Sequence, residues 1–150
     1  ITKILFVCYG NICRSPMAEF LLRDMVQKEG LADQFVIASA ATSAEEIGNG
    51  VHSGTRKILS RLGISCAGKT ARQMTRADYA QWDYLIGMDT GNLRSMRRIC
   101  GGDPDGKIYK LLELAGVDRD VADPWYTGDF ETTYRDIRLG CEALLRRVRG

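Results

Sequence analysis

A buried strand, a tight loop and a helix follow one another directly at the start of the chain. Ile4–Val7 is a continuous apolar run, which is typical of a strand covered on both faces of a parallel sheet. The segment from Tyr9 to Arg14 interrupts this run with a glycine and an asparagine, which both tolerate a positive φ. Ser15-Pro16 then predicts a capped helix start, and Gly30 predicts the end of that helix. This order is typical of the strand-to-helix unit of an α/β fold.

The rest of the chain continues the alternation of strands and helices. We expect further strands at Phe35–Ile37 and Tyr84–Ile86 and a weaker one at Lys107–Leu112, helices at Thr55–Leu62, Asn92–Ile99 and Phe130–Val148, and irregular segments at 40–50, 101–106 and 118–129. Alternating elements predict a three-layer α/β sandwich, in which helices flank a parallel sheet on both faces. Ligands bind beyond the carboxyl ends of the strands in such folds, and the loop after the first strand lies there.

Composition predicts a single folded domain over residues 1–150. The chain is 45% apolar and 27% charged, as in ordinary globular proteins, and its formal charge of +2 gives no reason to expect nucleic acid as a partner. Arginines cluster in two places, which we interpret as solvated helix faces: Arg94, Arg97 and Arg98, and Arg146, Arg147 and Arg149.

The distribution of apolar residues and the number of cysteines indicate in which cellular compartment the protein is expected. No apolar run reaches the roughly 18 residues of a membrane span, and Ile4–Cys8 is too short for the core of a signal peptide. The five cysteines are odd in number and include no Cys-x-x-Cys pair, which argues against a disulfide framework and a structural zinc site. We therefore expect a cytoplasmic protein without membrane contact, and the pattern leaves room for a reactive thiol.

The segment CYGNICRS carries the chemistry, because it places a cysteine six residues before an arginine across the first loop. Successive main-chain N–H groups of this loop can form a concave anion site at the helix N-terminus, and phosphate is the natural occupant of such a site. The N–H groups are those of Tyr9, Gly10, Asn11, Ile12, Cys13 and Arg14. Arg14 can hold two phosphate oxygens with its planar guanidinium. Cys8 faces the same site, which favours its thiolate, and the Ser15 hydroxyl is expected to hydrogen-bond the sulfur.

A thiolate that accepts a phosphoryl group also needs a proton donor for the departing oxygen. Asp123, in the segment DPWYTGDF, is the candidate, because a proline stiffens the turn after it and Trp125 and Tyr126 supply aromatic surface. Asp120 and Asp129 are alternatives, but neither has this proline and aromatic pair beside it.

CYGNICRSPMAE and the late DPWY together resemble the low-molecular-weight protein tyrosine phosphatase family, and the likeness, which includes YLIGMDTGNL, covers nearly the whole chain. The resemblance implies a four-stranded parallel sheet in the order 2-1-3-4 and a two-step mechanism. Cys8 would form a phosphocysteine while Asp123 protonates the leaving phenol, and Asp123 would then activate the water that hydrolyses it. Arg14 and the loop N–H groups would stabilise the equatorial oxygens.

The resemblance also implies the partners. Phosphotyrosine-containing proteins would be substrates, and phosphate or other oxyanions would be inhibitors. It implies no metal and no other cofactor, and no contact with nucleic acid or membranes.

Three further roles follow from the resemblance alone. Asn11 matches an asparagine held in a left-handed conformation, and Ser39 matches the serine that hydrogen-bonds it. Cys13 matches a second loop cysteine that can form a disulfide with Cys8 under oxidation, and a buried structural role is the alternative. Some relatives carry a histidine in the 65–72 stretch, which reads SCAGKTAR here. The single histidine, His52, lies elsewhere, and we interpret it as a surface or helix-capping residue.

The walls of the pocket would be aromatic. Tyr9, Trp125 and Tyr126 would give a depth suited to a phenol ring rather than to a short serine side chain. Glu45 lies on the rim, where relatives often have a bulky apolar residue, and this departure leaves the preferred peptide sequence open.

Three other functions compete with this interpretation. An arsenate reductase on the same fold needs further closely spaced cysteines, whereas Cys66, Cys100 and Cys141 are widely separated. A phosphocysteine carrier that passes its phosphoryl group to a sugar transporter has no need of Asp123. A non-catalytic phosphate-binding module is expected to lack Cys8.

Overall fold

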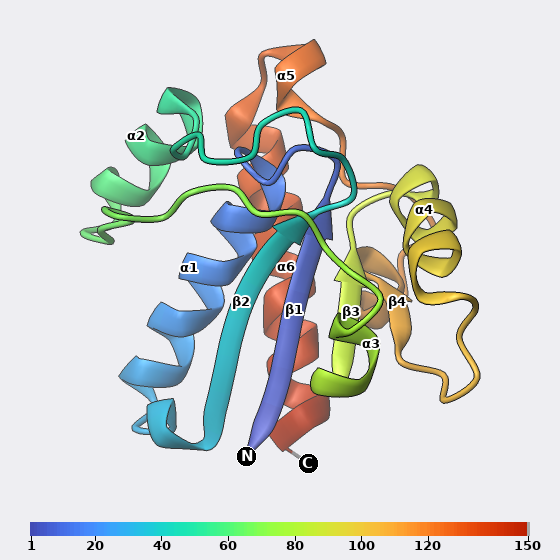
Figure 1. Ribbon diagram of the computed structural model, residues 1–150. Helices are drawn as coiled ribbons and strands as arrows, with labels where there is room; N and C mark the ends of the chain where they lie inside the picture. The colour runs from blue at the N-terminus through green and yellow to red at the C-terminus, as the bar shows by residue number, and fades with distance from the viewer. Residues whose placement is uncertain (150) are drawn as a thin grey trace.

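A computed structural model of the protein describes residues 1–149, and it contains one parallel sheet (Figure 1). The strands are β1 (Thr2–Cys8), β2 (Phe35–Ala41), β3 (Tyr84–Gly87) and β4 (Ile108–Lys110). They pair in the order β2-β1-β3-β4, and each neighbouring pair is parallel. The predicted four-stranded sheet and its order 2-1-3-4 are therefore confirmed.

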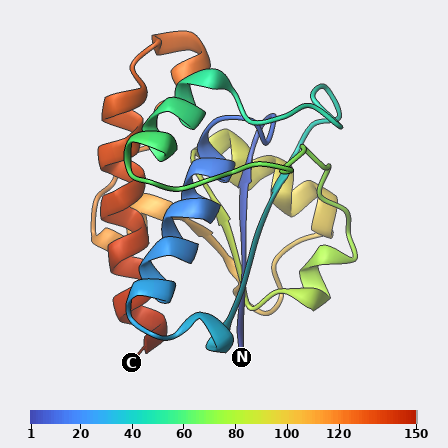
Figure 2. The same ribbon diagram turned by 90° about the vertical axis from the view of Figure 1, so that its left-hand side faces the viewer.

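Helices cover both faces of this sheet, as Figure 2 shows with the sheet nearly edge-on. They are α1 (Arg14–Lys28), α2 (Ser53–Arg61), α3 (Asp78–Gln81), α4 (Thr90–Cys100), α5 (Pro124–Thr127) and α6 (Phe130–Arg149), with 3-10 turns at η1 (Ala32–Gln34) and η2 (Leu111–Ala115). α1 and α6 lie on one face, and α3 and α4 lie on the other (Figure 2). This is the predicted three-layer sandwich.

The side chains of β1 explain why its sequence is apolar without interruption. Ile4 and Phe6 belong to the core shared with α1 and α6, whereas Leu5 and Val7 belong to the core shared with α4. Because alternate residues of a strand point to opposite faces, a central strand between two helical layers has no polar positions. None of these four side chains is exposed to solvent.

The carboxyl ends of β1, β2 and β3 meet at one edge of the sheet. Cys8 pairs with Ala41, and Val7 pairs with Gly87, so the segments that follow these strands start side by side. α5 lies over this edge, and both ends of the described chain lie at the opposite edge (Figure 1). The fold therefore gathers the loops after the strands at the end where ligands are expected.

The prediction that Ser15 caps the first helix is wrong. Helix α1 begins at Arg14, and the preceding residue, Cys13, makes no side-chain capping bond. The Ser15 hydroxyl lies 3.0 Å from the Cys8 sulfur instead. The loop turns directly into the helix, so Ser15 faces the loop rather than the free N–H groups of the first turn.

Other boundaries differ from the prediction as well, and the segment expected to be irregular at 40–50 begins within β2, which extends to Ala41. The strand expected at Lys107–Leu112 is only the three-residue β4, because Leu111 and Leu112 both pack into the core beneath α6. Consecutive residues of a strand point to opposite faces, so these leucines require the 3-10 turn η2. The irregular segment at 118–129 contains helix α5, which starts with Pro124 in its first turn. No helix within residues 1–149 has a stretch long and apolar enough to cross a membrane.

Candidate active site

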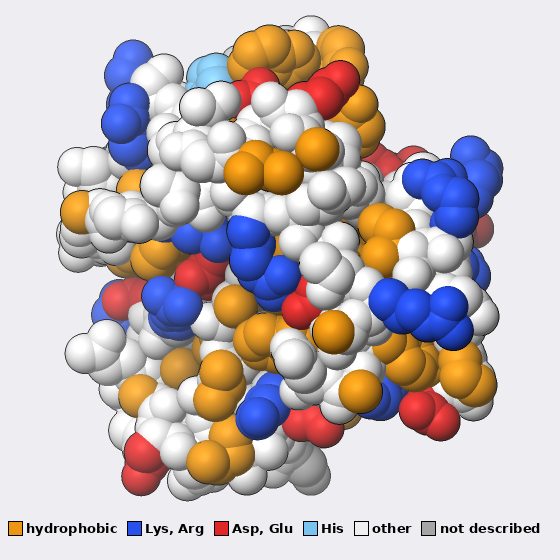
Figure 3. Space-filling model, viewed as in Figure 1, with side chains coloured by type: hydrophobic (Ala, Val, Ile, Leu, Met, Phe, Trp, Pro, Cys, Tyr) orange, Lys and Arg blue, Asp and Glu red, His pale blue; other side chains and the backbone are white. Residues whose placement is uncertain are grey.

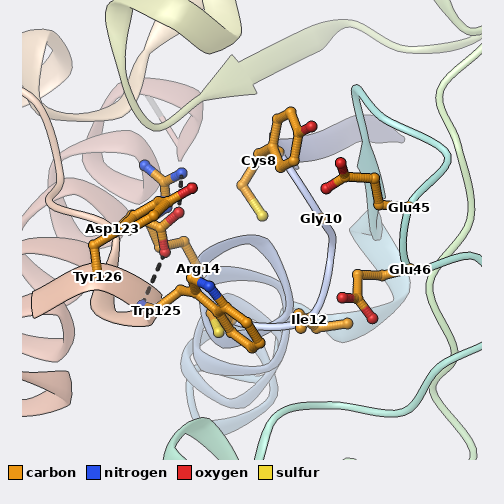
Figure 4. Close-up of a pocket in the computed structure, with 11 residues that line it drawn as sticks. Cys8, Gly10, Ile12, Arg14, Glu45, Glu46, Asp123, Trp125 and Tyr126 are labelled. Atoms are coloured by element: carbon orange, nitrogen blue, oxygen red, sulfur yellow. Dashed lines mark hydrogen bonds and ion pairs between the residues drawn. The ribbon is translucent and has the colours of Figure 1, made fainter. Parts of the chain in front are cut away.

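A pocket with a cavity volume of about 110 Å³ opens at the carboxyl end of β1 (Figure 4). Its lining comes from the first loop, the loop after β2 and the start of α5, and comprises Cys8, Tyr9, Gly10, Ile12, Cys13, Arg14, Glu45, Glu46, Asp123, Trp125 and Tyr126. The structure thus brings the predicted nucleophile, arginine, acid and aromatic walls into one place. Asn11, Ser15 and Ser39 are buried behind the loop.

The Cys8 sulfur points toward the middle of this pocket (Figure 4). It is 3.0 Å from Ser15 Oγ and 3.4 Å from the main-chain nitrogen of Ser15, which donates to it. Within residues 1–149, the main-chain N–H groups of residues 9–13 have no hydrogen-bond acceptor. These donors, at the N-terminus of α1, form a site that suits an oxyanion held next to the sulfur.

Asn11 fixes the shape of this loop. Its φ of 60° makes it the one non-glycine residue with positive φ among those described. Its Nδ2 donates to Ser15 Oγ at 2.8 Å and to Ser39 Oγ at 2.9 Å, and its Oδ1 accepts from the main-chain N–H of Arg72 at 3.2 Å. Every polar atom of the Asn11 side chain is therefore engaged in holding the loop.

The hydrogen-bond chain continues to a buried ion pair that sequence reasoning missed. Ser39 Oγ donates to Glu19 Oε1 at 2.5 Å, and Glu19 also pairs with Arg23 at 2.7 Å and Lys69 at 3.4 Å. Burial lowers the pKa of Lys69, and the attraction of Glu19 only partly opposes that effect. Ser15 and Glu19 are buried four residues apart on α1, and the exposed Arg23 follows at the same spacing, a polar pattern that could have revealed the network.

Lys69 lies in the 65–72 stretch, where some relatives carry a histidine. Its Nζ donates to the main-chain oxygen of Ser39 at 3.0 Å, in addition to pairing with Glu19. Lys69 therefore supplies, together with Arg23, the positive charge beside Glu19, and His52 accepts from Gly54 instead.

Arg14 is buried and held by three acceptors. Its Nη1 donates to Asp89 Oδ2 at 2.7 Å and to the main-chain oxygen of Val121 at 3.0 Å, and its Nη2 donates to Asp123 Oδ2 at 3.4 Å. Burial opposes its charge, but the Cys8 sulfur, Asp89 and Asp123 outweigh burial and raise the pKa of Arg14. The guanidinium is fixed in place before any anion binds.

Asp89 is another residue that sequence reasoning missed. It directly precedes α4, and its Oδ1 accepts from the main-chain N–H of Asn92, whose side chain in turn accepts from the main-chain N–H of Asp89. This reciprocal cap sits at the same sheet edge as Cys8. The signal was the Asp-Thr-Gly-Asn segment, which is a helix-start pattern directly after a buried strand.

Asp123 lies between Arg14 and the aromatic rim. Its Oδ1 accepts from the main-chain N–H of Trp125 at 3.1 Å, and its side chain remains 23% exposed. The rival carboxylates do not line the pocket: Asp120 pairs with Lys110, and Asp129 accepts from Thr132.

The rim has an aromatic side and an acidic side (Figure 4). Trp125 and Tyr126 stand on the α5 side and are largely exposed, whereas Glu45 and Glu46 stand across the pocket from them. A hydrogen bond to Glu45 raises the pKa of the Tyr9 phenol. The opening is thus apolar on one side and negatively charged on the other.

His52 supports the aromatic side from outside the pocket. Its Nδ1 accepts from the main-chain N–H of Gly54 at 3.0 Å, so it caps α2, as one of its two predicted roles stated. Its ring also stacks on Phe130 at 5.1 Å and meets the edge of Trp125 at 5.7 Å.

Cys13 lines the same pocket as Cys8, the predicted nucleophile. It is buried, and burial together with the charges of Cys8 and Asp123 raises its pKa to about 12. All five cysteines are free thiols in this structure. A disulfide between Cys13 and Cys8 remains a prediction.

Comparisons with known proteins agree on one family. The sequence profile described as "Low molecular weight phosphotyrosine protein phosphatase" matches residues 3–150. The chain is 44% identical over 148 residues to low molecular weight protein-tyrosine-phosphatase YfkJ of Bacillus subtilis, with 97% of this chain and 95% of the relative covered. It is 37% identical over 152 residues to low molecular weight phosphotyrosine protein phosphatase of Homo sapiens, with 97% and 95% covered. The crystal structure of YfkJ superposes with a TM-score of 0.95, at 44% identity, over 99% of this chain and 95% of that one.

Proposed function

The chain belongs to the low molecular weight phosphotyrosine protein phosphatase family, and on that basis we propose that it hydrolyses phosphotyrosine with Cys8 as its nucleophile. One arrangement supports the proposal above all others. The Cys8 sulfur, the unpaired main-chain N–H groups of the loop, the Arg14 guanidinium and the Asp123 carboxyl line a single small pocket.

In the first step, a lone pair of the Cys8 sulfur attacks phosphorus, and the bond from phosphorus to the phenolic oxygen breaks. That oxygen takes the electron pair and a proton from Asp123, so that a neutral phenol leaves. The loop N–H groups and Arg14 hold the three equatorial oxygens, where the charge of the transition state is spread. Because Arg14 is already fixed by Asp89, little of this stabilisation is lost in reorganisation.

In the second step, water attacks the phosphocysteine. Asp123, now a carboxylate, takes a proton from the water, and the phosphorus–sulfur bond breaks to give phosphate and the thiolate. Ser15 hydrogen-bonds the sulfur, and Asn11 fixes Ser15, so the loop stabilises the departing thiolate.

The pocket walls support aryl rather than alkyl phosphates. Ile12, Trp125 and Tyr126 supply apolar surface above the loop, and a phenol ring reaches from that surface to the sulfur at the pocket floor. We propose that phosphotyrosine-containing proteins are the substrates and that phosphate and similar oxyanions inhibit by occupying the loop.

The competing redox function finds no support in the positions of the other cysteines. Cys66, Cys100 and Cys141 do not line the pocket, and Cys141 is buried beneath α1, 3.8 Å from the main-chain oxygen of Ala18. A disulfide relay has to pass the disulfide on to further thiols, and Cys13 is the one cysteine besides Cys8 that lines the pocket within residues 1–149. A cytoplasmic location stays part of our proposal, because five free thiols suit a reducing compartment.

Hydrolysis of p-nitrophenyl phosphate and of a phosphotyrosine peptide, both in EDTA, tests the proposal. Cys8→Ser should abolish turnover and retain vanadate binding. Asp123→Ala should lower kcat on phosphotyrosine by about 10²- to 10⁴-fold, which is the usual contribution of a general acid, and much less on an activated phenol that needs no proton. Equal rates of wild type and Asp123→Ala on phosphotyrosine would rule out the acid assignment, and turnover by Cys8→Ser would rule out the nucleophile.

A further inference from the structure

A second hollow adjoins the phosphate pocket on the side of α4. Its cavity volume is about 510 Å³, and Tyr9, Arg14, Asp123 and Tyr126 line both it and the phosphate pocket. We call this second hollow the α4 groove. A peptide whose phosphorylated side chain enters the phosphate pocket therefore has the α4 groove directly beside it.

Two arginines one helical turn apart, Arg94 and Arg98, line the far side of the α4 groove. Both are exposed, and neither forms an ion pair with any residue from 1 to 149. Basic side chains accordingly gather on the side of the molecule where α4 lies (Figure 3). The function proposed above leaves these two charges unused.

The acidic residues of the α4 groove form no ion pair with Arg94 or Arg98. Asp89 and Asp123 line the groove too, but both carboxylates accept from Arg14, which is buried between them. Across the phosphate pocket, Glu45 and Glu46 give the opposite rim a negative charge. The combined opening of the pocket and the α4 groove therefore carries negative charge on the side of Glu45 and Glu46 and positive charge on the side of α4.

We propose that the α4 groove is a binding site for acidic side chains next to the phosphotyrosine of peptide substrates, with Arg94 and Arg98 as the groups that contact them. The inference rests on the proposed function and specifies the substrates of that same site. Guanidinium groups bind carboxylates through paired, charge-assisted hydrogen bonds, which suits an aspartate or glutamate in an extended peptide. Glu45 and Glu46 repel such residues, so the acidic segment of the peptide runs toward α4.

The test compares two phosphotyrosine peptides that differ only in having glutamate or glutamine on one side of the phosphotyrosine, and it is made once with these residues before the phosphotyrosine and once after it, since only one of the two directions places them over α4. In that direction, wild type should show a kcat/KM about three- to tenfold higher for the glutamate peptide at low salt, as expected for exposed ion pairs, and the ratio should fall toward one as salt rises. Arg94→Gln combined with Arg98→Gln should bring the ratio to about one. Because both peptides meet the same enzyme preparation, any loss of folded protein cancels from the ratio.

Arg97→Gln is the matched control, since Arg97 lies on the same helix, is exposed and does not line the groove. It should keep the wild-type ratio and the wild-type rate on p-nitrophenyl phosphate. A wild-type ratio of one in both directions, an unchanged ratio in the double variant, or an equal loss in Arg97→Gln would each overturn the inference. Failure of wild type to hydrolyse either peptide would instead refute the proposed function, and this inference with it.

Discussion

Two substitutions of Asn11 distinguish the effect of its positive φ from the effect of its side-chain hydrogen bonds. The residue has a φ of 60° and makes three side-chain hydrogen bonds, to Ser15, Ser39 and Arg72. Asn11→Gly removes the hydrogen bonds but accepts the backbone conformation. Asn11→Ala removes the same bonds and adds the steric cost of a Cβ atom in the left-handed region.

The structure gives the size of each effect. Three hydrogen bonds at about 0.5–1.5 kcal/mol each amount to a loss of roughly 2–4 kcal/mol of unfolding free energy in Asn11→Gly. The left-handed conformation costs an alanine roughly 1–2 kcal/mol more than a glycine, so Asn11→Ala should be less stable again by that amount. For a chain of this length, Asn11→Gly should lower Tm by roughly 4–16 °C.

Urea unfolding of wild type and both variants, followed by circular dichroism, measures these differences. Asn49 is the control, because it is exposed and does not have a positive φ. There the order should reverse, with Asn49→Ala more stable than Asn49→Gly by about 0.4–1 kcal/mol, since glycine adds entropy to the unfolded chain. Wild-type stability in Asn11→Gly, or an Asn11→Ala variant as stable as Asn11→Gly, would refute the assignment of strain and hydrogen bonds to this residue.

Two further substitutions test packing and charge around the site. A Cβ atom on Gly54 would lie 2.4 Å from the Phe130 ring, so Gly54→Ala should lower the free energy of unfolding, measured in urea, by about 1–3 kcal/mol. Gly50→Ala is the control, because a Cβ atom there meets no atom within 4 Å, and it should cause no such loss. Equal losses in the two variants would contradict the contact between Gly54 and Phe130. Burial opposes ionisation of Asp78, but hydrogen bonds from Arg72 and its neighbours outweigh it and lower the pKa of Asp78. A depressed folded-state pKa stabilises the fold above the unfolded value of about 4, and the contribution is lost as pH falls through the folded value. Asp78→Asn should therefore lower Tm at pH 7 by an amount that shrinks below about pH 4, and a pH-independent difference in thermal unfolding would count against the ion pair.

The parts of the site that local sequence predicts are those whose geometry is set within a few residues. The Cys8 loop depends on the strand before it, the helix after it and an asparagine that tolerates positive φ, and all three signals are contiguous. Asp123 depends on the proline and aromatic residues beside it. Local patterns predict these elements because the hydrogen bonds among Cys8, Asn11 and Ser15 and the one from Trp125 to Asp123 span at most seven positions, whereas the bonds of Asn11 to Ser39 and Arg72 depend on the fold.

The missing residues are those that reach the site only through the fold. Asp89 contacts Arg14 across 75 positions, and Lys69 contacts Glu19 across 50, because strand pairing brings their segments to one edge. The four-residue spacing on α1 names Arg23 as one partner of the buried Glu19, but its second partner, Lys69, cannot be named from spacing. The strand predicted at Leu111 and Leu112 was wrong for a related reason, because packing beneath α6 decides whether these two residues form a strand or a 3-10 turn.

The two aspartates that contact Arg14 both cap a helix, but they bind Arg14 differently. Both precede a helix and accept a main-chain N–H with Oδ1, Asp89 at the start of α4 and Asp123 at the start of α5. Asp89 commits its other oxygen to Arg14 at 2.7 Å and is fixed by the reciprocal cap with Asn92.

Asp123 holds the same guanidinium only loosely, at 3.4 Å, and its helix is a single turn that ends at Gly128. An orienting group needs a short, saturated contact, whereas an acid must release a proton to the leaving oxygen and so needs an oxygen that is not fully engaged. On these distances we propose that Asp89 positions Arg14 and that Asp123 is the acid of the proposed mechanism.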